Sequence, residues 1–219
     1  MDCNDLDKGP AATGRREVNR LIGNGNAQRR ETWNARDHMP RERTYLRYQL
    51  YRSQARKQAW FSIAQLQRRL DIGGCTTIDF SRVRFDPINT QALDAFQRWD
   101  DPYFSWHEVI EWKAREPLAL DIAVWFEQQL CGLCFANPNN SRRRLRIVRL
   151  EGCPGGTHPL KNRIAMLALI VIEQYAQLIG SEVLEVQEPL EGAISIYQKL
   201  GFGFDKEGRL VKTLENLVP

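Results

Sequence analysis

The chain has 219 residues, and 42% of them are hydrophobic, which suits one sizeable domain with an appendage or two small domains. We expect neither a membrane protein nor a secreted one, because no apolar run could span a bilayer and the start, MDCNDLDKGP, lacks a signal-peptide core. The five cysteines are odd in number and scattered, which argues against a disulfide framework and favours the cytoplasm.

The formal net charge of +4 is unevenly distributed along the chain. Residues 1–70 carry 15 Lys and Arg against 7 Asp and Glu, whereas residues 71–219 carry 16 against 20. A basic N-terminal part therefore precedes a mildly acidic body. Such a part often contacts nucleic acid or another anionic partner. The alternative is a solvated tail without a partner.

The N-terminal third is expected to consist of two segments. Residues 1–40 are poor in apolar side chains and rich in Gly, Asn and Arg, which predicts a disordered or loosely attached basic arm. Residues 41–73 are predicted to be a helical extension, because apolar residues recur at steps near three and four. The residues of this repeat are Leu46, Leu50, Trp60, Ile63, Leu66 and Leu70.

Residues 74–219 show a regular succession of elements without internal repeats. In chain order we predict a strand (76–85), two helices (89–101 and 104–115), two strands within 118–137, a strand (142–152), a buried helix (157–180), a strand (182–188), a helix (191–201) and a strand (208–214). The buried helix is expected to begin at Thr157 or His158 and to end at Gly180. Strand 142–152 is expected to place Leu145, Ile147 and Arg149 on one face.

The stretch LEVQEPLEGAISIYQKLGFGF, residues 184–204, carries the most informative motif. After a strand come residues with the spacing Ala-x-x-x-Tyr-x-Lys-x-Gly-Phe, namely Ala193, Tyr197, Lys199, Gly201 and Phe202. Together with the element order, this ending resembles the GNAT superfamily of acyl-CoA-dependent N-acetyltransferases over residues 76–215.

The resemblance implies an α/β fold of GNAT type, with a mixed, mostly antiparallel sheet flanked by helices and, here, a basic helical N-terminal extension. It also implies transfer of an acetyl group from acetyl-CoA, as co-substrate, to a primary amine. The amine could belong to a small molecule or to a macromolecule, such as a protein lysine or an aminoacyl-tRNA. The alternative is a degenerate GNAT-fold binding module whose basic arm contacts nucleic acid or a partner protein.

Two catalytic residues are carried over from the resemblance. Tyr197 would protonate the departing thiolate of coenzyme A, or else it merely packs in the core. Glu151, at the end of the strand before the buried helix, would accept the proton of the amine, or else it is an exposed carboxylate. His107 and Glu108 compete with Glu151 for that role.

The acceptor is expected to lie near Trp106, His107 and Glu108. These residues belong to a segment with dense aromatic side chains, which together with carboxylates suit a cationic amine. Six aromatic residues lie within seventeen positions: Phe96, Trp99, Tyr103, Phe104, Trp106 and Trp112. Most of them could equally be core residues.

The pyrophosphate of the co-substrate would bind at the start of the buried helix, where backbone N–H groups are unpaired. The residues expected to bind the co-substrate are Lys161, Asn162, Arg163, Ile164 and Ala165 at this helix start, together with Leu150 and Gly152 of the preceding strand, which would hold the pantetheine by backbone bonds. The loop departs from the family pattern, since Leu160 replaces a Gln or Arg and Arg163 replaces the first glycine. Three interpretations stay open: the side chains of Lys161 and Arg163 bind phosphate, the preceding GCPGG loop binds it, or the site is degenerate.

No metal site is expected. The pair CGLC at residues 131–134 lies in a predicted strand, where residues three apart point to opposite faces, and no second pair completes a zinc site. The sequence leaves the acceptor, the oligomeric state and the biological setting open. Delivery into another cell as an effector is an alternative to the cytoplasm.

Overall fold

The computed structural model describes residues 35–72, 78–155 and 158–215. Most of the predicted basic arm therefore lies outside the described residues. Within those ranges, no helix combines the length and the apolar character needed to cross a bilayer.

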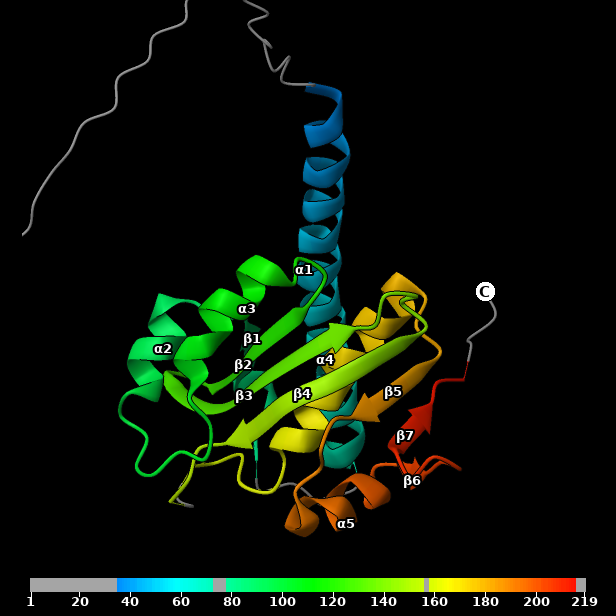
Figure 1. Cartoon of the computed structure of the whole chain (residues 1–219). Coiled ribbons are helices and arrows are strands. Elements are labelled where there is room, and N and C mark those ends of the chain that lie inside the picture. The colour runs from blue at the N-terminus through cyan, green and yellow to red at the C-terminus, as the bar shows by residue number, and fades with distance from the viewer. Residues whose placement is uncertain (1–34, 73–77, 156–157, 216–219) are drawn as a thin grey trace, which may run out of the picture. The chain divides into compact units, whose positions relative to one another are not determined.

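A single seven-stranded sheet forms the centre of the molecule (Figure 1). Its strand order is β1-β2-β3-β4-β5-β7-β6, and every neighbouring pair is antiparallel except β4 and β5. The strands are β1 Val83–Asp86, β2 Leu120–Phe126, β3 Gln129–Pro138, β4 Arg144–Gly152, β5 Val183–Val186, β6 Gly203–Phe204 and β7 Leu210–Thr213. The mixed, mostly antiparallel α/β sheet that the resemblance implied is confirmed by this order.

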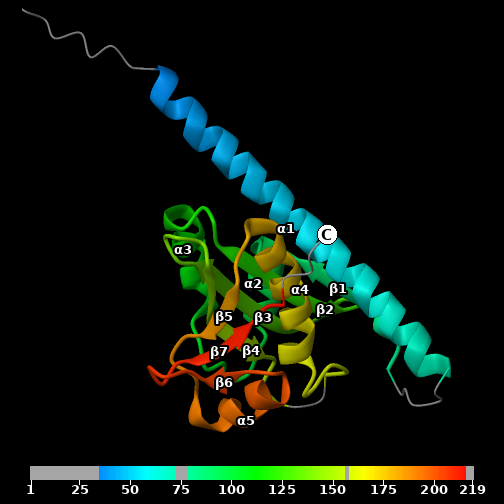
Figure 2. The ribbon, with the colours of Figure 1, turned by 90° about the vertical axis from the view of Figure 1, so that its right-hand side faces the viewer.

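Helices cover the two faces of the sheet unequally (Figures 1 and 2). The helices are α1 Ala35–Ile72, α2 Thr90–Phe96, α3 Val109–Arg115, α4 Ile164–Ile179 and α5 Glu191–Lys199, with short 3-10 helices η1 Phe80–Arg82 and η2 Trp106–Glu108. Helices α1 and α4 share one hydrophobic core with one face of the sheet. Helices α2 and α3 cover part of the other face through a second core.

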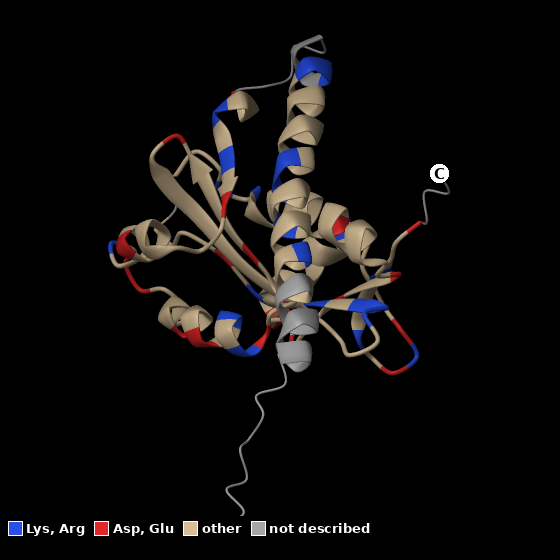
Figure 3. Ribbon diagram, turned by 90° about the horizontal axis from the view of Figure 1, so that it is seen from above, with Lys and Arg blue, Asp and Glu red and all other residues tan. Residues whose placement is uncertain are grey.

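Helix α1 packs with a different face from the one that its large apolar residues predicted. Tyr48, Ala55 and Ala59 are buried against the body together with one member of the predicted repeat, Ile63. Three other members, Leu46, Leu50 and Trp60, are exposed. Small alanines allow the helix to approach closely, because they add little side-chain bulk between the backbones. The Lys and Arg residues of α1 are seen along its turns in Figure 3.

Two arginines of α1 also donate hydrogen bonds to backbone carbonyl groups of the body. Arg52 is 8% exposed, and its Nη1 donates to the carbonyl oxygens of Pro117 at 2.9 Å and Ala119 at 2.8 Å. Arg56 donates in the same way to the carbonyl oxygen of Asp121 at 3.2 Å. The helix is thus tied to the segment that leads into β2.

Two predicted boundaries were wrong for local reasons. The expected strand at residues 76–85 is η1 followed by the short β1, because Asp79 accepts hydrogen bonds from the N–H and hydroxyl of Ser81 and caps a turn. The buried helix begins at Ile164, not at residue 157 or 158. Asn162 has a φ of 64°, which interrupts a helix. The predicted end is confirmed, with Gly180 left-handed at φ 77°.

A β-bulge in β4 corrects the predicted face of Arg149. Phe135 lies opposite Arg149 and Ala136 lies opposite Ile147, so Val148 is an extra residue on β4. Leu145 and Ile147 enter the core shared with α4 as predicted. Arg149 instead points to the face covered by α3.

We expect Arg52→Met to lower the free energy of unfolding by about 2–4 kcal/mol, because the carbonyl groups of Pro117 and Ala119 would lose a charged donor in a buried position. Chemical denaturation of both proteins measures this. Arg47→Met, at an exposed position of the same helix, is the matched control and should change stability by less than about 0.5 kcal/mol. Equal effects of the two substitutions would contradict the anchoring role of Arg52.

Candidate active site

The parallel strands β4 and β5 separate toward their C-terminal ends. Their pairing ends where Ile147 lies opposite Val186, and the N–H of Gln187 donates to the carbonyl oxygen of Ile147 at 2.9 Å. Strand β4 then continues to Gly152 paired with β3 alone. About half of its backbone N–H and C=O groups there point away from β3, on the side that β5 has left.

The chain turns sharply after β5 at Glu188. This residue has a φ of 46°, a left-handed conformation that is uncommon for residues other than glycine. Such backbone conformations cluster at functional sites, where the surrounding structure maintains them. The carboxylate of Glu188 is exposed.

A cavity of about 400 Å³ lies between the end of β4, the start of α4 and helix α5, and we call it the loop cavity. Six of the seven residues predicted to bind acetyl-CoA line it: Leu150, Gly152, Lys161, Asn162, Ile164 and Ala165. Arg163 is not among the lining residues, and its Nη1 donates to the carbonyl oxygen of Lys161 at 3.2 Å. Pro154 and Gly155 of the preceding loop also line the cavity.

The start of α4 offers backbone donors to this cavity. The helix-capping residue, Arg163, makes no side-chain hydrogen bond to the first turn, so the N–H groups there lack a side-chain acceptor. Asn162 holds the left-handed conformation that a glycine would adopt easily, and asparagine tolerates it better than most residues. The turn before α4 is therefore made by an asparagine, not by the residue at the expected glycine position, Arg163, which is right-handed.

His158 lines the loop cavity with an unsatisfied nitrogen. The residue is 6% exposed, and its buried Nδ1 has no hydrogen-bond partner among the described residues. Burial lowers the pKa of the His158 imidazole, and the charge of Lys161 lowers it further. A neutral imidazole with a free nitrogen is suited to a hydrogen bond with a ligand.

Two glycines allow α4 to begin directly on the sheet. A Cβ atom at Gly132 of β3 would lie 2.4 Å from Cγ2 of Ile164, and one at Gly152 would lie 3.3 Å from its Cγ1. Ile164 is the first residue of α4 and lines the loop cavity. Because Gly132 and Gly152 have no side chain, the first residue of α4 can approach β3 and the end of β4 closely.

A second cavity, of about 410 Å³, lies on the opposite side of the strand separation, and we call it the aromatic cavity. Tyr103, Phe104 and Trp112 contribute aromatic side chains to it. Helix α3 is held in place there, because Lys113 donates to the buried carboxylate of Asp121 at 2.7 Å. Leu150, Ala193 and Tyr197 line both cavities.

Tyr197 therefore stands where the two cavities meet. Its residue is 6% exposed, and its ring packs edge-on against Phe202 at 5.4 Å between centroids. Burial is the main cause that raises the pKa of the Tyr197 phenol far above its usual value, with a smaller contribution from Cys134. The hydroxyl makes no hydrogen bond to another described residue. The phenol thus keeps its proton at neutral pH.

Glu151 is held by three donors from the segment before α3. Its carboxylate accepts from the backbone N–H of Tyr103 at 2.6 Å, from the N–H of Phe104 at 3.3 Å and from Nε1 of Trp106 at 2.7 Å. It lines neither cavity. Glu151 therefore holds in place the loop with Tyr103 and Phe104, whose rings form the wall of the aromatic cavity. Its role as a base stays a prediction, which these bonds do not favour.

The three residues predicted to contact the acceptor lie behind that wall. Trp106 is fully buried. His107 is exposed and packs against the ring of Phe96, and Glu108 forms an ion pair with Arg149 at 3.1 Å. None of the three is among the residues that line the aromatic cavity.

Arg149 forms the floor of the aromatic cavity. Its guanidinium lies 4.2 Å from the centroid of Trp112 and 5.1 Å from that of Phe104, and it donates to the carbonyl oxygen of Ser105 at 3.0 Å. With Glu108 as its ion-pair partner, the arginine stiffens both aromatic rings. Its charge is therefore largely committed to the protein.

Several residues of the two cavities were missed by sequence reasoning. The aromatic density of residues 96–112 was a usable signal, but it could not separate the rings that face a cavity, such as Tyr103, from those that build the core. Glu188 and His158 carried no signal, because their roles depend on a backbone angle and on burial. Only the folded chain shows either property.

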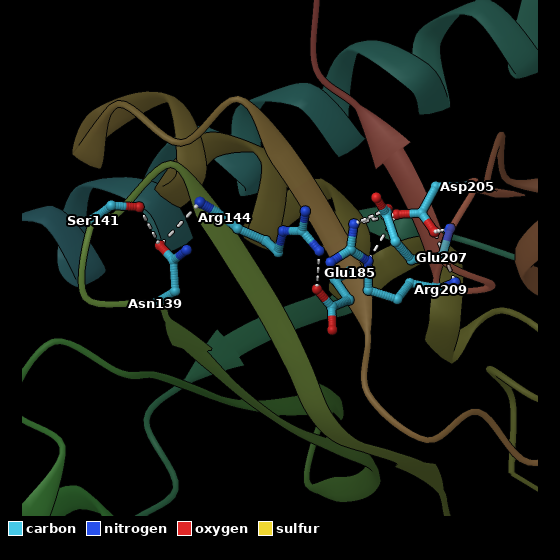
Figure 4. Close-up of polar contacts among 7 residues, drawn as sticks. All are labelled: Asn139, Ser141, Arg144, Glu185, Asp205, Glu207 and Arg209. Atoms are coloured by element: carbon cyan, nitrogen blue, oxygen red, sulfur yellow. Dashed lines mark hydrogen bonds and ion pairs between the residues drawn. The ribbon is translucent and has the colours of Figure 1, made fainter.

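The sheet face next to the aromatic cavity is polar. Arg144 of β4 pairs with Glu185 of β5 at 2.6 Å, and Arg209 pairs with Asp205 at 2.7 Å and also contacts Glu207 (Figure 4). Among the described residues, no helix lies in front of this part of β4, β5 and β7 (Figure 1). The aromatic cavity thus borders an uncovered, charged surface.

The cysteines of the site are thiols without metal-binding geometry. In the described part of the chain, no group of three or more His, Cys, Asp or Glu could hold a metal ion. Cys131 and Cys134 are buried and free within β3. Burial raises the pKa of Cys131 to about 11 and also raises that of Cys153, which lines the loop cavity.

No protein-family model matches the sequence, and no curated protein matches it. Several solved structures have a fold similar to that of this chain. Ard1 from Thermoplasma volcanium is 10% identical with a TM-score of 0.48, and the match covers 62% of this chain and 99% of that one.

Two further structures show the same kind of likeness. A GNAT family acetyltransferase from Elizabethkingia anophelis with acetyl-CoA bound is 12% identical with a TM-score of 0.43, over 61% of this chain and 99% of that one. The aminoglycoside 6'-N-acetyltransferase from Enterococcus faecium is 17% identical with a TM-score of 0.45, over 60% and 96%.

Proposed function

We propose that this chain is an N-acetyltransferase that moves an acetyl group from acetyl-CoA to a primary amine. The observation that supports this most strongly is the meeting of two cavities at Tyr197, beside the open edge of β4. A donor and an acceptor that enter from opposite sides would meet there. Each cavity has a volume typical of a small-molecule site.

The loop cavity fits the diphosphate and pantetheine parts of acetyl-CoA. Lys161 supplies a positive charge, the first turn of α4 supplies backbone N–H donors, and His158 supplies a free nitrogen. The open edge of β4 supplies backbone groups for the two amides of a pantetheine arm. This is the first of the three interpretations of the loop, with Lys161 in place of Arg163 as the principal side chain.

Bound acetyl-CoA would supply the acetyl group as a thioester, which an amine can attack. In this transfer a C–N bond forms, the C–S bond breaks and coenzyme A leaves as a thiolate. The hydroxyl of Tyr197 is the described donor best placed to protonate that thiolate, because it lies at the junction and keeps its proton. An uncharged phenol also avoids placing a negative charge beside the leaving thiolate.

The amine must lose its proton before or during the attack, and Glu188 is our choice for the acceptor of that proton. Its residue lines the aromatic cavity, and its carboxylate makes no hydrogen bond within the described part of the chain. Glu151 is saturated by three donors. A free carboxylate also attracts the ammonium form of the amine into the cavity.

The acceptor would enter the aromatic cavity from the uncovered sheet face. Its rings suit the alkyl chain or cationic head of an amine. Both a small molecule and a lysine or amino-terminal segment of a macromolecule could approach over this open surface.

We expect Lys161→Gln to weaken acetyl-CoA binding about tenfold, because a charge-assisted contact to phosphate would be lost. Isothermal titration calorimetry measures this directly. Arg163→Gln is the matched control two positions away and should change the dissociation constant by less than about twofold, since Arg163 does not line the cavity. Absence of binding by the unaltered protein would contradict the proposal and favour a GNAT-fold binding module without a co-substrate.

Tyr197→Phe should lower kcat about 100-fold while acetyl-CoA binding stays within about threefold, because the ring and its contact with Phe202 are kept and only the acid is removed. Steady-state kinetics with a panel of amines, together with calorimetry, separates the two quantities. A variant with unchanged kcat would show that Tyr197 only packs.

We expect Glu188→Gln to lower kcat about 100-fold, because the group that accepts the proton of the amine would be lost. Glu151→Gln should leave kcat within about threefold. It should instead raise KM for the amine and lower the melting temperature, because the loop that carries Tyr103 would lose part of its anchor. If Glu151→Gln gave the result expected for Glu188→Gln, and the reverse, Glu151 would be the base.

A further inference from the structure

A groove follows the outer edge of β1, and we call it the edge groove. It consists of a cavity of about 470 Å³ between α1 and β1 and one of about 1030 Å³ beside η1 and the β2–β3 turn. Trp60 and Arg84 line both. None of the residues that line it belongs to the loop cavity or the aromatic cavity.

Aromatic rings are exposed on the wall that α1 contributes. Trp60 is 41% exposed and Phe61 is 51% exposed, and their rings meet edge-to-face at 5.3 Å between centroids. Adjacent large aromatic side chains on a helix surface are usually buried or functional. Here they border a groove and contribute nothing to the buried core.

The opposite wall carries flat guanidinium groups. Arg82 lies 4.9 Å from the ring centroid of Phe126, and Arg84 lies 5.1 Å from that of Trp125. Each is also held by a neighbouring carboxylate, Arg82 by Glu127 and Arg84 by Asp86. Their planes are therefore fixed, although both side chains are more than 40% exposed.

Positive charge exceeds negative charge along the groove. Its lining contains four cations, Arg56, Lys57, Arg82 and Arg84, but only two carboxylates, those of Asp86 and Glu127. Lys57 is exposed and has no ion-pair partner within the described residues. Figure 3 shows Lys and Arg on both α1 and the neighbouring strand.

We propose that the edge groove binds single-stranded nucleic acid. Proteins bind single strands without regard to sequence by combining a positive groove with flat surfaces on which bases stack. Trp60 and Phe61 provide aromatic surfaces, fixed arginine planes provide further ones, and Lys57 is free to meet a phosphate. The excess of arginine and lysine in residues 1–70 adds positive charge to the same end of the chain.

An acidic peptide is the competing occupant, because β1 is an edge strand and could add another strand. Strand β1 has only four residues, however, and peptide addition relies on main-chain hydrogen bonds, not on exposed flat side chains. The combination of rings and fixed guanidinium planes favours bases. The site is independent of acetyl transfer.

Fluorescence anisotropy of the full-length protein with labelled 15-nucleotide single-stranded RNA and DNA tests the proposal. We expect Trp60→Ala to weaken binding about tenfold, since loss of one stacked base lowers affinity by roughly 5- to 100-fold. Trp60→Phe should recover most of the affinity. Lys57→Glu should weaken binding by a similar factor and reduce its dependence on salt.

Two controls separate the groove from general charge. Lys206→Glu makes the same charge change on the exposed turn between β6 and β7 and should alter affinity by less than about twofold. Leu50→Ala removes an exposed apolar side chain from α1, outside the groove, and should have no effect. Circular dichroism melts verify that each variant is folded.

Three results would overturn the proposal. One is no binding of single strands at low salt. Another is binding that Trp60→Ala and Lys57→Glu leave unchanged, which would assign the nucleic acid to another part of the chain. The third is binding of a labelled acidic peptide, sensitive to the same substitutions, without binding of RNA or DNA.

Discussion

The separation of β4 and β5 is the constraint on which the rest of the site depends. A parallel ladder satisfies the backbone groups of both strands, and here it stops after the bond from Gln187 to Ile147. The bulge at Val148 falls at the same level and rotates the rest of β4. As a result Arg149 faces Trp112 of α3 and Glu151 faces the segment before α3, while Leu150 packs against the core that contains α4. The two cavities are the two sides of this one break in the sheet.

The order of elements could be predicted from the sequence because each element has its own local signal. Glycine at position 180, alternation at the start of β4 and the apolar length of α4 are all short-range patterns. The same holds for the C-terminal motif, whose Tyr197 lines both cavities in the structure. Most of the expected co-substrate contacts also line one cavity, since residues around the end of β4 and the start of α4 must meet when a strand feeds a helix.

What could not be predicted depends on contacts between distant segments. The inward face of α1 is set by Arg52 and two alanines, because carbonyl groups near residue 118 accept from the arginine. Of the large apolar residues that predicted the inward face, Ile63 is buried, but Leu46, Leu50 and Trp60 are exposed. In the same way, Glu151 looks like a free carboxylate until the segment with Tyr103 and Trp106 folds onto it. In both cases hydrogen bonds between polar atoms determine the arrangement, and hydropathy patterns carry no information about such bonds.

The packing of α1 has a consequence for synthesis on the ribosome. This helix is translated before the other described elements, yet the core that buries Tyr48 and Ile63 includes β2 and α4, which are encoded far downstream. Until residue 179 has emerged, the helix has no complete partner, so its docking closes a long loop of chain. A nascent chain that stalls before α4 would therefore display an unshielded, arginine-rich helix. Co-translational chaperones would meet this protein at its N-terminal helix.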